Sequence, residues 1–221
     1  MISSRRSESG SALIYILIAI ALLAALTASF MQPGNQQASS QNIVKTVSDL
    51  KSQAEFIRSA VQECVLMYPG GDSNLIGEPN FPYPISPVSA DPLVRNIGCP
   101  GNPGDGSVHA KIFGGMSGKF LPPPTALFGE WGYHNGPDGV YFYTRTDKTD
   151  AYLQSALERL DEEFAECEAD IVTGAMGSGS DPDAPECPAD NKCFRIWMIT
   201  QASAADAYDA AGPEAAANCP M

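Results

Sequence analysis

The chain has 221 residues, of which 26 are acidic and 13 basic, so its formal charge at neutral pH is -13. This length and a hydrophobic content of 44% suit a single globular domain. The strong negative charge argues against nucleic acid as a partner, because phosphate groups would be repelled. Most of the acidity lies near the end of the chain, where 15 acidic residues and only three basic ones follow residue 148.

A long apolar segment lies near the N-terminus. The stretch from Ala12 to Leu26 (ALIYILIAIALLAAL) carries no charge. About 20 helical residues span ~30 Å, the thickness of the hydrocarbon core of a bilayer. Two arginines precede the segment and no basic residue follows it until Lys45, so the positive-inside rule predicts a cytoplasmic N-terminus. We therefore expect a transmembrane helix over residues 11–31, between a cytoplasmic leader, 1–10, and an exported head, 32–221.

The region 40–68 is predicted to form an amphipathic helix. A proline and a glycine at positions 33 and 34 separate it from the apolar segment, and Pro69-Gly70-Gly71 ends it. A coiled coil would show the same spacing, but regular flanking charge pairs are missing, so packing onto a domain is favoured. The apolar residues recur every three or four positions, as on one helix face: Ile43, Val47, Leu50, Ala54, Ile57, Val61, Cys64 and Tyr68.

The rest of the chain alternates loops with short elements. Recurring prolines predict loops over residues 72–124. Two aromatic-rich runs around Asn-Gly-Pro-Asp-Gly predict a β-hairpin over 129–144. An apolar face opposite an acidic one predicts a helix over 150–170, and alternation predicts a strand over 193–200. The expected fold class is α+β, in which a long N-terminal helix, half membrane-spanning and half amphipathic, packs on a small antiparallel sheet.

The cysteines indicate an oxidising compartment. Their number is even and all follow the apolar segment, which suits disulfide formation in an exported head. Six cysteines allow fifteen pairings, and we predict only Cys64–Cys99, because these two stand apart from the rest. Half a zinc site at Cys187 and Cys193 is the alternative, but no histidine lies nearby. The six are Cys64, Cys99, Cys167, Cys187, Cys193 and Cys219.

The residues form no recognisable catalytic motif. The two histidines, His109 and His134, stand apart from any patterned nucleophile or acid, and hydrolase, metalloprotease and nucleotide-binding motifs are missing. We therefore expect a protein that is not an enzyme and has no cofactor. One acidic loop (SDPDAPECPADN) offers alternating carboxylates of the kind that calcium prefers, without the spacing of an EF-hand. Its candidate ligands are Asp181, Asp183, Glu186 and Asp190, and a solvated acidic loop is the alternative.

The N-terminal residues resemble the leader and membrane helix of type IV pilins and type II secretion pseudopilins. A short basic leader, MISSRRSESG, ends at Gly10, and the apolar run follows from Ser11. The resemblance implies that a prepilin peptidase cuts after Gly10. It also implies that the retained helix anchors the chain in the bacterial inner membrane and later packs against other pilin-like subunits. The helix over 40–68 fits the outer half of the family's long first helix.

Two departures bear on the role of the subunit. Tyr15 stands at the fifth residue after the cut, where the family usually has glutamate, and Ser11 replaces the usual phenylalanine or methionine. The missing glutamate favours a minor or tip subunit. The expected function is structural, in a pilus or secretion-type filament, with a disulfide-bonded head in the periplasm, or outside the cell once assembled. The alternative is a single-pass membrane-anchored or secreted periplasmic binding domain.

Overall fold

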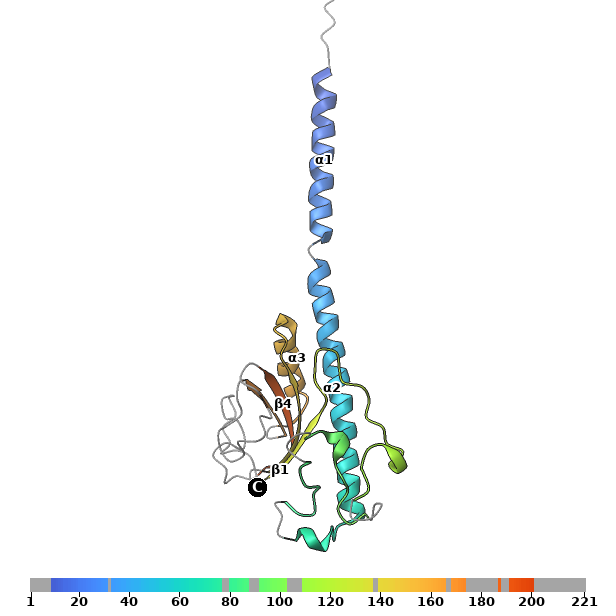
Figure 1. Cartoon of the computed structure of the whole chain (residues 1–221). Coiled ribbons are helices and arrows are strands. Elements are labelled where there is room, and N and C mark those ends of the chain that lie inside the picture. The colour runs from blue at the N-terminus through green and yellow to red at the C-terminus, as the bar shows by residue number, and fades with distance from the viewer. Residues whose placement is uncertain are drawn as a thin grey trace, which may run out of the picture. The chain divides into compact units, whose positions relative to one another are not determined.

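The structure is a computed structural model of the chain (Figure 1). The chain divides into two compact units, residues 1–42 and 43–221. The elements are α1 (Ser9–Met31), α2 (Pro33–Met67), β1 (Gly132–Gly136), β2 (Gly139–Thr146), α3 (Ala151–Asp161), β3 (Ala169–Thr173) and β4 (Lys192–Thr200), with 3-10 helices η1 (Ser73–Leu75), η2 (Val94–Asn96) and η3 (Gly115–Ser117). The residues described are 9–31, 33–76, 80–87, 92–102, 109–136, 139–165, 168–173, 187 and 191–200.

The break that the sequence predicts at residues 33 and 34 lies at the boundary between α1 and α2. α1 ends at Met31, and α2 begins at Pro33 and runs to Met67. Proline suits the first turn of a helix, because its missing N–H would have no intrahelical acceptor there. The second helix therefore starts seven residues before the predicted boundary at residue 40.

The sheet has four antiparallel strands in the order β1-β2-β4-β3. The predicted hairpin is confirmed as β1 and β2, in which Gly136 pairs with Gly139. The predicted strand over 193–200 is confirmed as β4, which lies between β2 and β3. The α+β class, the small antiparallel sheet and the presence of disulfides are thus as expected, and the membrane half of the predicted helix stays a prediction.

The predicted helix over 150–170 is wrong in its second half. α3 ends at Asp161, and Ala169–Thr173 forms β3, paired with β4. Ile171, Val172 and Thr173 are β-branched residues, which favour a strand once a partner offers hydrogen bonds. Pairing with β4 therefore decides the structure of a segment whose apolar spacing also fits a helix.

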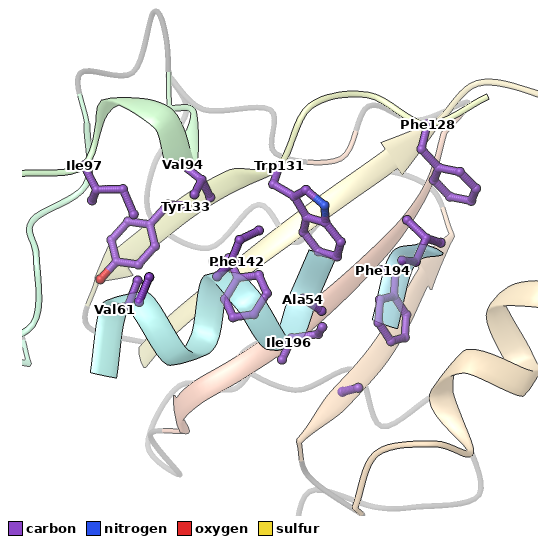
Figure 2. Close-up of a cluster of buried hydrophobic side chains, with 14 of the residues drawn as sticks. Ala54, Val61, Val94, Ile97, Phe128, Trp131, Tyr133, Phe142, Phe194 and Ile196 are labelled. Carbon is purple, nitrogen blue, oxygen red and sulfur yellow. The ribbon is translucent and has the colours of Figure 1, made fainter. Parts of the chain in front are cut away.

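The core of the head lies between α2 and one face of the sheet. The six predicted stripe residues from Val47 to Cys64 are buried, and Ile43 and Tyr68 pack at the margin. They join Phe142, Phe194 and Ile196 of the sheet in one cluster, to which α3 adds three leucines. Figure 2 shows part of this cluster, with side chains of α2 and of the sheet pointing toward one another. The predicted amphipathic face is confirmed as the face that packs on the sheet.

The other face of the sheet holds a buried ion pair. Arg195 of β4 donates from Nε to Oδ1 of Asp170 on β3 at 2.8 Å, and a second bond joins its Nη2 to Oδ2. The guanidinium lies over the rings of Trp197 and Tyr141, at 4.9 and 5.3 Å from their centroids. Removing one partner of such a pair would leave a buried charge, at a cost of about 3–5 kcal/mol.

The outer side of β1 is bounded by a short segment from the loop region. Tyr133 donates its N–H to the carbonyl of Pro92, and Val94 donates to the carbonyl of Trp131, at 2.8 Å each. Leu93 and Gly132 form an isolated bridge between these bonds. Residues 92–94 thus bond the start of β1 on its outer side without forming a further strand. Farther along, the Ser86 hydroxyl accepts the N–H of Asn135 at 2.7 Å and donates to its carbonyl at 3.2 Å.

Two disulfides fix loops onto these elements. Cys64–Cys99, the predicted pair, joins the end of α2 to the loop region over a separation of 35 residues. Cys187 pairs with Cys193 at the start of β4 over six residues, so the zinc alternative for these two cysteines is wrong. Every cysteine that the structure describes is paired. Cys167 and Cys219 lie outside the described residues.

The two disulfides should contribute unequally to stability. In the chain-entropy treatment, closing 35 residues is worth about 4 kcal/mol and closing six about 2 kcal/mol. The double variant Cys64→Ala/Cys99→Ala should therefore lose more free energy of unfolding than Cys187→Ala/Cys193→Ala, measured by urea denaturation of the full chain in detergent. Equal losses would show that the loop entropy does not govern their contributions.

Gly132 is a second test of the packing. A Cβ at this position would lie 2.3 Å from Cζ of Tyr143, the buried residue opposite it on β2. Gly132→Ala should cost about 1–3 kcal/mol of unfolding free energy because the ring cannot move away freely. The cost should shrink in a Tyr143→Leu background, measured as a double-mutant cycle. Gly129→Ala, whose Cβ would stay 3.6 Å from its nearest neighbour, is the matched control.

Candidate functional site

The predicted processing and metal residues fall at the margins of the described structure. Gly10 and Ser11 lie in the first turn of α1. The four candidate calcium ligands, Asp181, Asp183, Glu186 and Asp190, lie outside the described residues. Within the described ranges, no group of His, Cys, Asp and Glu side chains could hold a metal ion. The calcium hypothesis therefore stays a prediction.

α1 exposes apolar side chains over its whole circumference. Every side chain from residue 13 to 27 is exposed, and the large apolar ones have exposed fractions between 49% and 70%. These ten are Leu13, Ile14, Tyr15, Ile16, Leu17, Ile18, Ile20, Leu22, Leu23 and Leu26. Among the helical residues that the structure describes, none form a stretch long and apolar enough to cross a bilayer.

This exposure is unfavourable in water. Fully burying one large apolar side chain is worth about 1.5–3 kcal/mol, so ten that stay roughly half to two-thirds exposed forgo on the order of 10 kcal/mol. Soluble proteins rarely show such a continuous apolar surface unless another molecule or a membrane covers it. The surface of α1 between residues 13 and 27 is therefore a candidate interaction site.

The two histidines make structural contacts. His109 Nε2 lies 2.8 Å from Oδ2 of Asp72, whose other oxygen accepts the N–H of Asn74 at the start of η1. His134 stacks on Tyr141, with ring centroids 4.7 Å apart. These contacts join loops and strands and do not bring a nucleophile to a base.

A pocket of about 320 Å³ opens in the head between α2, the loop region and the residues before β1. Its walls are largely apolar and include three consecutive exposed prolines, whose fixed φ angles make the wall stiff. The lining residues are Gln53, Leu93, Arg95, Phe113, Gly114, Phe120, Leu121, Pro122, Pro123, Pro124, Glu130 and Trp131.

Gln53 holds two walls of this pocket together. Its Oε1 accepts a hydrogen bond from Trp131 Nε1 at 2.8 Å, and its Nε2 donates to the carbonyl of Pro123 at 2.8 Å. The side chain is buried, and its bond with Trp131 is shielded from water. α2 thereby fixes the spacing between the tryptophan wall and the proline wall.

Two of the lining residues, Arg95 and Glu130, form an ion pair. The Arg95 guanidinium donates to the Glu130 carboxylate, and the two side chains are 50% and 45% exposed. An exposed pair of this kind contributes about 0–1 kcal/mol to stability. The pocket therefore combines apolar walls with a cation and an anion that solvent can reach.

Sequence reasoning did not find this pocket. The apolar stripe predicted for residues 40–68 does not include Gln53, whereas its side chain is buried and bonded to Trp131 and Pro123. The lining residues come from segments separated by up to 78 positions, so no local motif could reveal them. The three consecutive prolines were the one visible signal of a stiff wall.

Comparison of the chain with protein-family models, with curated proteins and with solved structures finds no match.

The contact at Asp72 predicts a dependence of stability on acid pH. The N–H of Asn74, and then the His109 ring, lower the pKa of Asp72 below 3.8. The carboxylate therefore contributes stability above that value, and the contribution is lost as pH falls through the lowered pKa. Asp72→Asn should be less stable than wild type in urea at pH 7, and the difference should vanish at lower pH.

The exposed α2 carboxylate Glu55 offers a matched control. Glu55→Gln should leave the urea midpoint nearly unchanged at pH 7. A stability difference between Asp72→Asn and wild type that persists unchanged into strong acid would show that the charge of Asp72 is not the cause.

Proposed function

We propose that this chain is a pilin-like structural subunit of a type IV pilus or a type II secretion-type filament, in a minor or tip position. The observation that carries the proposal is the apolar surface of α1, exposed on all sides between residues 13 and 27. A surface of this kind is suited to lipid before assembly and to the helices of other subunits afterwards. Small residues at positions 19, 21, 24 and 25 would allow close helix approach.

The head supports this proposal in a second way. Its α+β core is built on α2, and disulfides fix its loops, as suits a domain exported from the inner membrane to the periplasm. The head is also strongly acidic, which favours solubility outside the membrane. In this proposal residues 1–10 form a cytoplasmic leader, and the helix over 11–31 is the anchor and later the filament core.

A second candidate function is a membrane-anchored or secreted periplasmic binding domain. The pocket beside Gln53 is the observation that favours it, because a structural subunit does not require a cavity of that kind. In this case α1 is only an anchor, or part of a signal segment that is removed.

Processing of the leader separates these functions. Prepilin peptidase should cut wild-type protein after Gly10, so mature protein from host membranes should begin at Ser11. Gly10→Leu should retain the leader, because a bulky residue replaces the glycine at the cut, and Ser9→Ala should be processed normally. Intact mass and N-terminal sequencing measure both.

Each other outcome has a defined meaning. Normal processing of Gly10→Leu would contradict the pilin-like proposal. A mature N-terminus near Phe30 would indicate a secreted soluble domain, and an intact Met1 in wild type would indicate a plain anchor.

A further inference from the structure

We propose that the pocket beside Gln53 binds a free α-amino acid with a large apolar side chain, aromatic side chains above all. This inference goes beyond the proposed filament role and does not depend on it, because it concerns only the head. Three features of the pocket carry it: its size, its walls and the charge pair among its lining residues.

The size of the pocket sets the scale of the ligand. Its volume, about 320 Å³, lies at the small end of the ~300–1,000 Å³ found for pockets that hold drug-sized ligands. A single amino acid is of the right order, whereas a folded partner or a long peptide would need an extended groove.

The walls suit a flat apolar group. Pro122, Pro123 and Pro124 present exposed rings on one side, and Phe120 adds an aromatic ring that is 69% exposed. Aromatic and proline-lined surfaces favour ring-shaped or large apolar groups by contact area and ring geometry. Because Gln53 and the prolines fix the walls in advance, little conformational freedom is lost on binding.

The charge pair selects the polar end of the ligand. Arg95 and Glu130 offer a cation and an anion within hydrogen-bond distance of one another. An α-amino acid carries a carboxylate and an ammonium on one carbon, so its carboxylate can bind Arg95 while its ammonium binds Glu130. Loosening an exposed protein pair costs little, and two new charge-assisted bonds replace it. A ligand with a single charge would leave one of the two groups without a ligand partner.

The test uses full-length protein in detergent and L-phenylalanine as the probe. The indole N–H signal of Trp131, assigned with Trp131→Phe, reports binding at the site in NMR titrations. L-phenylalanine should bind with a Kd on the order of 1 mM or lower. 3-Phenylpropionate and 2-phenylethylamine, which each keep one charge, should bind at least about fivefold more weakly.

Variants assign the two charges. Arg95→Gln should weaken binding of L-phenylalanine about fivefold without weakening that of 2-phenylethylamine. Glu130→Gln should weaken binding of L-phenylalanine about fivefold without weakening that of 3-phenylpropionate. The exposed pair Lys148–Asp147 gives a matched control, since Lys148→Gln should change none of these affinities. Unchanged melting temperatures show that the variants fold.

Three results would overturn the proposal. The first is the absence of any change in the Trp131 indole signal with millimolar L-phenylalanine. The second is binding of the singly charged analogues as tight as that of L-phenylalanine. The third is an unchanged affinity for L-phenylalanine in folded Arg95→Gln and Glu130→Gln. The comparison of the three ligands on wild-type protein shows whether both charges of the amino acid are recognised, even if a variant does not fold.

Discussion

The burial of one face of α2 against the sheet is the contact on which the rest of the head depends. The face from Val47 to Cys64 contributes six buried side chains, and the strands beneath contribute their inward-facing rings and aliphatic groups. A four-stranded sheet with one apolar face is not stable without such a cover. The same helix provides one end of the Cys64–Cys99 disulfide, so the loop region is tied to the element that forms the core.

Gln53 shows how this arrangement also forms a cavity. The residue lies beside the apolar stripe. Its side-chain amide forms hydrogen bonds with Trp131, next to the sheet, and with Pro123, in the loop region. A buried amide is tolerated only when its polar atoms are bonded, and these two bonds meet that requirement while fixing the spacing of the walls. The pocket is therefore a consequence of a polar residue placed at the margin of a hydrophobic interface.

Much of the fold was predictable from local pattern, and the site was not. The spacing of apolar residues predicted the buried face of α2, and turn residues predicted the β1–β2 hairpin. The isolation of Cys64 and Cys99 from the other cysteines predicted their pairing. β3 was missed because Ile171 continues the helical spacing of Leu153 and Leu157, and only pairing with β4 shows that it is a strand.

The segment beside β1 has a consequence for contacts between separate molecules of this protein. Edge strands with open hydrogen-bonding groups can pair with the edge strand of a neighbouring molecule and begin aggregation. At β1, the carbonyl of Pro92 accepts the N–H of Tyr133, and a proline has no N–H with which to extend the ladder. The N–H of Tyr133 at this edge is therefore already bonded and is not open to the strand of a neighbouring molecule.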